Sequence, residues 1–223
     1  MPPGYPAHMT GVQNDEPILL PVGHYMGARY QGKAFQEHSI RGGWNSMSLD
    51  DTQLKVYFLG HGTPERMQAG ERNTRRSLVE QATSLGLPQA SKVVDWLVQN
   101  GALVEVLPGT PQIRDFARTY RFCPMMIGLG NSPDTPWMWD IGFIGQPVIT
   151  VSANAWKLWG YGVMSNTLWE ACESWAASNR RINLPEREFH DPAHVLDDFL
   201  DTLPALIAAH AGYLDFPPTP MPA

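Results

Sequence analysis

Arginines gather at two places in the middle of the chain, with a short polar run between them. The side chains that this pattern brings forward are Arg72, Arg75, Arg76, Gln89, Ser91, Lys92, Arg114 and Arg118. Guanidinium groups pair well with phosphate oxygens, and glutamine, serine and lysine at the start of a helix can hydrogen-bond base edges in the major groove of DNA. The pattern therefore indicates contact with nucleic acid, and an ordinary solvated surface is the alternative.

A first helix is predicted over residues 49–59, ahead of the arginines. Ser48 and Asp51 have the spacing of a capping box, and a Gly-His-Gly run ends the segment. A strand is the alternative, because apolar side chains also alternate at Leu54, Val56 and Phe58.

Two more helices are predicted at 74–84 and 88–99, separated by Gly86. An Asn-Thr pair can cap the first of them, and its apolar face is expected to hold Leu78, Ala82 and Leu85. A strand over 102–107 follows, then a turn rich in Gly and Pro, and then a possible return strand or arm.

This order resembles a winged helix-turn-helix domain over about residues 48–121. The residues that carry the resemblance are Ala82, Leu85, Gly86, Leu87, Val93, Leu97, Gly101, Leu103 and Val104. It implies a DNA-binding transcriptional regulator, expected to act as a homodimer. The first three arginines would then anchor phosphates, the polar run would face the major groove, and Arg114 and Arg118 would lie on or near the wing.

A second interpretation uses the same elements for peptide recognition. Short strands over 18–44, followed by three helices, resemble the order found in the peptide-recognition elements related to PqqD, which serve the maturation of ribosomal peptides. That resemblance implies binding of an extended leader peptide as an added strand. An enzyme of unknown reaction ranks third, because His61 has no identifiable nucleophile or acidic partner near it in the sequence.

The C-terminal half is rich in tryptophan. A hairpin is predicted from the two apolar runs at 137–144 and 148–151, and helices over 166–178 and from Asp191 onward, with Pro204 kinking or dividing the last one. The tryptophans can form a core, a ligand pocket or a dimer surface, and these alternatives stay open. His190 and His194 have helical spacing for a metal, but no metal or cofactor is expected, since Pro192 marks a helix start between them.

The charge of the chain is uneven. Its 223 residues carry a net charge of −6, but residues 61–125 carry +2, whereas 1–60 carry −1 and 126–223 carry −7. The acidic total does not favour nucleic acid, whereas the distribution leaves a DNA-facing middle possible.

The order of the expected elements and the winged-helix resemblance predict an α+β protein of two domains. We expect a winged-helix-like domain at 18–121, an aromatic-rich α+β domain at 122–215, and tails at 1–17 and 216–223. No internal repeat is apparent. No apolar membrane span or signal segment is apparent either, so we expect a cytoplasmic protein without a membrane partner.

Overall fold

The structure is a computed structural model that describes residues 16–183 and 185–218. Within them the fold is α+β, as the sequence predicts. The two expected tails fall largely on residues 1–15 and 219–223, which lie outside the described residues. Phe216 is described, and it packs against other parts of the chain.

The N-terminal unit, residues 18–106, begins and ends with strands that pair with each other. Strand β1 pairs antiparallel with β5, and the meander β2-β3-β4 forms a separate sheet. The bounds are β1 Ile18–Pro21, β2 His24–Gln31, β3 Ala34–Gly42, β4 Asn45–Leu49, α1 Asp51–Leu59, α2 Pro64–Gln68, α3 Arg75–Ser84, α4 Ala90–Gln99 and β5 Leu103–Val106. Helix α5, Gln112–Thr119, then leads into the second half.

The C-terminal unit, residues 121–215, is built in the same way. Strand β6 pairs antiparallel with β10, and β7-β8-β9 form a meander of their own. The bounds are β6 Arg121–Pro124, β7 Ile127–Gly130, β8 Met138–Phe143, β9 Gln146–Ser152, α6 Ala153–Tyr161, α7 Leu168–Ile182, the 3₁₀ helix η1 Arg187–His190, α8 Pro192–Ala208 and β10 Gly212–Asp215.

The two units therefore repeat one topology: a strand, a three-stranded meander, helices, and a closing strand that pairs with the first. Helices α1, α3 and α4 correspond in order to α6, α7 and α8. The closing ladders even share their register, because Pro21 faces Leu103 in one and Pro124 faces Gly212 in the other. The expectation that the chain has no internal repeat is wrong at the level of structure.

Equivalent backbone contacts support the correspondence. The N–H of Val22 donates to the carbonyl of Ala102 at 2.9 Å, and the N–H of Met125 donates to that of Ala211 at 3.0 Å. In each unit the residue just before that alanine has a left-handed backbone that ends the preceding helix, with φ of 75° at Gly101 and 53° at His210.

The first helix of each unit retains a trace of sequence similarity. Helices α1 and α6 each have nine residues, with Asp50 and Ser152 as side-chain N-caps and Gly60 and Gly162 as C-caps. The sequence leading to the glycine is LKVYFLG in one and WKLWGYG in the other. Both units thus bury an aromatic residue at the same place, three residues before that glycine.

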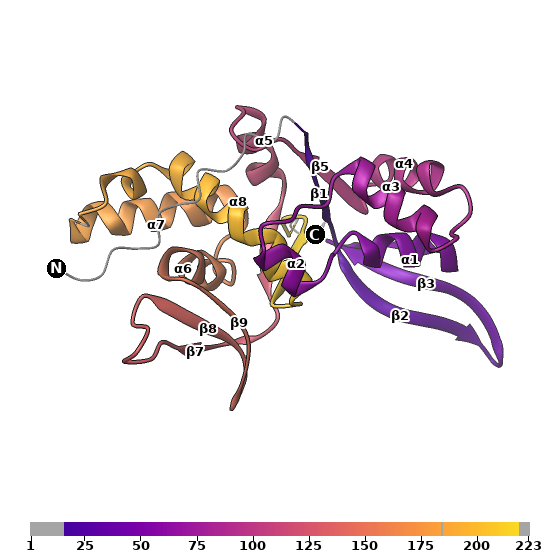
Figure 1. Cartoon of the computed structure of the whole chain (residues 1–223), viewed down its shortest axis with the longest axis horizontal. Helices are drawn as coiled ribbons and strands as arrows, with labels where there is room; N and C mark the ends of the chain where they lie inside the picture. Colours follow the sequence, from indigo (N-terminus) through magenta and orange to yellow (C-terminus); the bar gives the residue numbers. More distant parts are fainter. Residues whose placement is uncertain (1–15, 184, 219–223) are drawn as a thin grey trace, which may run out of the picture.

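The two units pack on each other. One hydrophobic core lies within the N-terminal unit, and a larger one joins residues of both. A bridge between Val22 and Leu214 brings the end of β1 beside β10. Figure 1 shows the units next to each other along the longest axis, with the β2–β3 hairpin extending away from the body.

Several details differ from the sequence predictions. Helix α1 starts after Asp50, whose capping box with Gln53 replaces the one expected at Ser48. Ser48 instead belongs to β4, because Leu49 pairs with His38 across the sheet. The return strand or arm expected after β5 is helix α5, so the wing is not formed by a hairpin there, and the winged helix as such is not confirmed.

The remaining helix predictions are largely confirmed. Thr74 caps α3, and Gly86 has the positive φ expected of a sharp turn, at 72°. Pro204 does not divide the last helix, since α8 runs continuously from Pro192 to Ala208. Helix α6 and strand β7 were not predicted.

Candidate functional site

The arginines expected to anchor phosphates are mostly paired within the chain. Arg72 forms an ion pair with Asp201 on α8. Arg75 pairs with Asp95 on α4 and forms two hydrogen bonds to Glu105 on β5, of 3.0 and 2.9 Å. The Glu105 hydrogen bonds are the main reason that the pKa of Arg75 is raised. These two guanidinium groups hold elements together, and phosphate would have to displace their carboxylates.

The other predicted DNA-contacting residues are scattered. Arg114 and Arg118 lie on α5 over the ring of Trp169, at 4.3 and 5.7 Å from its centre, and not on a wing. These two arginines are exposed, as are Arg76 at the start of α3 and the polar run Gln89, Ser91 and Lys92 at the start of α4. The chain therefore brings together only the last three.

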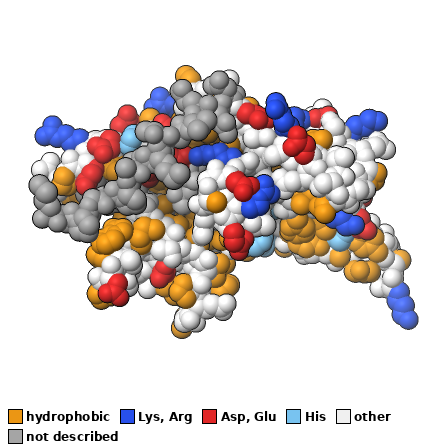
Figure 2. All heavy atoms as spheres, in the orientation of Figure 1, with side chains coloured by type: hydrophobic (Ala, Val, Ile, Leu, Met, Phe, Trp, Pro, Cys, Tyr) orange, Lys and Arg blue, Asp and Glu red, His pale blue; other side chains and the backbone are white. Residues whose placement is uncertain are grey.

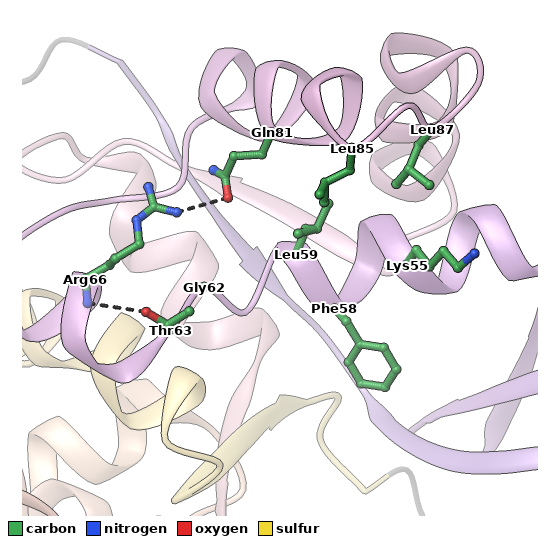
Figure 3. Close-up of a pocket in the computed structure, with 9 residues that line it drawn as sticks. All are labelled: Lys55, Phe58, Leu59, Gly62, Thr63, Arg66, Gln81, Leu85 and Leu87. Carbon is green, nitrogen blue, oxygen red and sulfur yellow. Dashed lines mark hydrogen bonds between the residues drawn. The ribbon is translucent and has the colours of Figure 1, made fainter.

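An apolar pocket of about 510 Å³ lies between α1, α2 and α3 (Figure 3). Its apolar lining is formed by Phe58, Leu59, Leu85 and Leu87. Leu85, which was expected on one apolar face with Leu78 and Ala82, is 64% exposed, whereas those two are buried. The cation Arg66 at its edge is held by Glu71 at 2.6 Å and Gln81 at 3.0 Å.

Hydrophobic side chains also gather on the surface over α1 and the β2–β3 hairpin (Figure 2). The exposed members are Met26, Tyr30, Phe35 and Phe58. Rings touch along this surface, with centroids 5.7 Å apart for Tyr30 and Phe35 and 5.2 Å for Tyr25 and Phe58. Exposed apolar surface of this kind is more typical of protein contacts than of a DNA-binding face.

A groove of about 320 Å³ runs beside β4, between this strand and the end of α4. One wall is formed by Asn45, Ser46 and Met47, and the other by Asn100, Gly101 and Ala102. The remaining lining consists of Val22, Ile40, Gly42 and Phe216. Consecutive residues of a strand point to opposite faces, so a cavity lined by three in a row lies at the strand's edge.

Strand β4 is an edge strand, since among the described residues it pairs only with β3. Gly43 and Trp44 form the two-residue turn between them, with φ of 57° at Gly43, which favours glycine there. In such a hairpin the pair that flanks the turn is hydrogen-bonded and the pairs then alternate. Ser46 and Ser48 therefore present their backbone N–H and C=O groups away from β3, along the free edge.

Phe216, which follows the last strand of the chain, occupies one end of this groove. Its ring lies closely against Gly42, where an added Cβ would come within 3.1 Å of a ring carbon. The Tyr120 ring lies 5.2 Å from it, centre to centre. Asp215 fixes the backbone of Phe216 beside the β3–β4 turn, since its Oδ1 accepts hydrogen bonds from the N–H of Gly43 at 2.5 Å and from that of Phe216 at 2.9 Å.

Sequence reasoning missed every residue of this groove as a functional candidate. Two signals were present. The stretch Asn45–Leu49 alternates polar and apolar residues, which is typical of a half-buried strand, and Gly42-Gly43 before it is typical of a hairpin turn. Nothing in the sequence links Phe216 to that strand.

The histidines and cysteines offer little other chemistry. His194 packs against the ring of Phe189 at 5.3 Å, and the described part of the chain holds no group of three or more metal-ligating side chains. Burial raises the pKa of both Cys123 and Cys172, which disfavours the reactive thiolate.

Of the tryptophans in the C-terminal half, Trp159 and Trp169 are buried in the core that the two units share.

Two further findings concern membrane-spanning segments and similarity to known proteins. Over the residues described, every helix is too short or too polar to cross a membrane. Comparison with protein-family models, with curated proteins and with solved structures finds no match at all, so the geometry of the chain itself must carry any assignment.

Proposed function

We propose that the N-terminal unit is a recognition module that binds an extended peptide segment of a partner protein as an added strand on β4. The observation that carries this proposal is the edge of β4 that no described residue pairs with, beside a groove already occupied by an aromatic side chain from the same chain. Strand addition supplies affinity through main-chain hydrogen bonds and specificity through pockets for alternate side chains.

The edge has the groups that such binding requires. Ser46 and Ser48 each offer one donor and one acceptor to a ligand strand, and their small side chains leave its approach open. Ligand side chains that point inward would meet Met47, Ile40 and Val22, which supply an apolar floor. A second concavity of about 490 Å³ lies at the other end of β4, where it is lined by residues 48–52 among others.

The second unit supports the proposal by contrast. Pro147 is the second residue of β9, as Ser46 is of β4. Proline has no N–H and is one of the residues that protect sheet edges from pairing. The chain thus blocks one of its two equivalent edges at the position where the other remains open.

The test is a proline substitution on β4 with a matched control. Peptides selected from a random display library against the full chain serve as probes, and their dissociation constants are measured by fluorescence anisotropy. Ser46→Pro should weaken binding about fivefold or more, because it removes an outward donor and places a ring in the ligand's path. Ser46→Ala keeps the amide and should bind like the original chain.

A complementary measurement leaves the protein unchanged. Methylation of alternate backbone nitrogens of a selected peptide should abolish binding in one register and spare it in the other, as expected of a strand paired along one side. Equal affinities for folded Ser46→Pro and the original chain, or indifference to N-methylation in both registers, would exclude strand addition.

DNA binding is the second candidate, and one observation favours it. Gln89, Ser91 and Lys92 are exposed together at the start of α4, where a recognition helix would place base-reading residues. The test is a mobility shift with DNA from upstream of the protein's own gene, across a salt titration. If the protein binds DNA, its affinity should fall steeply as the salt concentration rises, and the variants Arg76→Ala and Lys92→Ala should bind DNA more weakly. No shift at low salt would exclude it.

A further inference from the structure

We infer that the groove beside β4 contains a subsite for an aromatic side chain, that partner peptides place a Phe, Tyr or Trp there, and that Phe216 competes with them for it. This inference rests on the proposed function and specifies its ligand. The chain would then hold its own groove partly closed, and a partner peptide would have to displace the segment that begins at Phe216.

The shape of the subsite carries the first step. Gly42 makes room for the ring, since a Cβ there would lie only 3.1 and 3.2 Å from two ring carbons, and Gly101 lies beside the ring, where a Cβ would be in ordinary contact at 3.9 Å. The Tyr120 ring closes another side. A flat ring lies closely against the Gly42 backbone, and a side chain at position 42 would force the ring to shift, so the space suits an aromatic group.

The resident occupant fills the subsite incompletely, which is the second step. Phe216 keeps 36% of its surface exposed, so the pocket does not enclose it. The β10–β6 ladder ends at Asp215, and the only backbone tie of Phe216 in the described residues is to the neighbouring carboxylate. It is therefore held mainly by its ring and by the Asp215 contact with Gly43.

The residues after Phe216 favour exchange. Pro217 and Pro218 have no N–H groups, so they cannot donate hydrogen bonds to the edge of β4. A partner peptide with ordinary residues on either side of its aromatic side chain can fill the same subsite and also form the ladder. It gains hydrogen bonds that Pro217 and Pro218 cannot donate, and so it can displace Phe216.

The test uses the full-length chain with single substitutions at position 216. Peptides are selected from the random library against Phe216→Ala, in which the subsite is empty. We expect enrichment of an aromatic residue at one position of the selected peptides. A peptide so selected should bind Phe216→Ala about fivefold tighter than the original chain, because a competitor that fills the site most of the time lowers apparent affinity by the fraction of free sites.

The controls separate competition from a change in folding. Phe216→Tyr retains a ring and should bind that peptide like the original chain, and Ile144→Ala, which shortens a 90% exposed side chain in the other unit, should have no effect. The same peptide with its aromatic residue replaced by alanine should not distinguish Phe216→Ala from the original chain. Circular dichroism and thermal unfolding verify that each variant is folded.

The outcomes also distinguish this inference from the proposed function. If peptides bind and Ser46→Pro weakens them, but Phe216→Ala leaves affinity unchanged or reduces it, the competition is refuted and the peptide module stands. Selected peptides without an aromatic residue would refute the aromatic subsite in the same way. If no peptide binds either Phe216→Ala or the original chain, the proposed function fails and this inference fails with it.

Discussion

Acidification should destabilise the fold through His61. Its ring lies 4.9 Å from the Tyr57 ring and 5.8 Å from the Phe58 ring, centre to centre. Burial is the main reason that the pKa of His61 falls from 6.5 to about 4; the Tyr57 carbonyl, 3.1 Å from Nδ1, opposes the fall, and His210 adds to it. Folding therefore requires a neutral imidazole over a pH range in which a solvated one is charged.

The sign and size follow from linkage. Between pH 6.5 and about 4 the unfolded chain binds a proton at His61 that the folded chain does not. Stability is thus complete above pH 6.5, decreases as the pH falls, and levels off below the folded pKa. The full interval corresponds to about 3 kcal/mol, and because the ring keeps some exposure to solvent we expect about 2 kcal/mol by pH 4.

The measurement compares the original chain with His61→Gln. Urea unfolding followed by tryptophan fluorescence gives the free energy of unfolding of both proteins at several pH values from 7 to 4. All other titrating groups are shared, so they cancel in the difference between the two proteins. The original chain should lose about 2 kcal/mol more than the variant over this range. Parallel curves would refute the assignment of this pH dependence to His61.

Three further predictions concern stability, each measured by urea unfolding. Gly162→Ala should cost about 3 kcal/mol, because the new Cβ would lie 2.4 Å from the backbone carbonyl oxygen of Phe122. Gly60→Ala should cost about 1 kcal/mol, because its Cβ would lie 3.0 Å from the end of the Leu103 side chain; equal costs would contradict this. Phe199→Ala should cost about 3–5 kcal/mol, since the side chain is fully buried. Asp215→Ala should cost about 2 kcal/mol by leaving the N–H groups of Gly43 and Phe216 unpaired, and Asp215→Asn, which keeps an acceptor, about half of that.

Local signals predicted the helices well where caps and turn residues decide the structure. The Asn-Thr pair before α3 and Gly86 after it were sufficient for that helix, because a hydroxyl cap and a positive φ act within a few residues. The end of α4 at Asn100-Gly101 was predicted for the same reason.

The errors arose where distant segments decide. Ser48 has the sequence context of a cap, but pairing of Ser48 with Ser39 and of Leu49 with His38 extends β4 through both residues. Residues 112–119 were expected to be a return strand or arm, yet Ile113 and Phe116 are buried in the core shared with the C-terminal unit, which favours a helix there. Neither the strand pairing nor this burial can be predicted from the few residues on either side in the sequence.

The candidate site was beyond prediction for a related physical reason. Two arginines that suggested phosphate contacts meet carboxylates far away in the chain, Asp201 for Arg72 and Glu105 for Arg75. The groove combines β4 with the end of α4 and with Phe216, which follows β4 by about 170 residues in the sequence. The internal repeat was hidden because what it preserves is mostly backbone geometry, with a recognisable sequence only at the first helix of each unit.

The repeated topology places different residues at corresponding positions of the two units. Each unit's closing strand is followed by a segment that packs on the other unit: α5 places Arg114 over Trp169, and Phe216 enters the groove beside β4. Each unit thus places a segment on the other, but the two segments differ in how deeply they are buried. The first segment forms part of the shared core, whereas the second leaves an aromatic ring partly exposed at an open sheet edge. Of the two corresponding strands, β9 carries Pro147 where β4 carries Ser46, so β4 alone of this pair has an N–H group at that position. In the proposed function a ligand strand would use the edge of β4, and the C-terminal unit would contribute Phe216, the side chain that such a ligand has to displace.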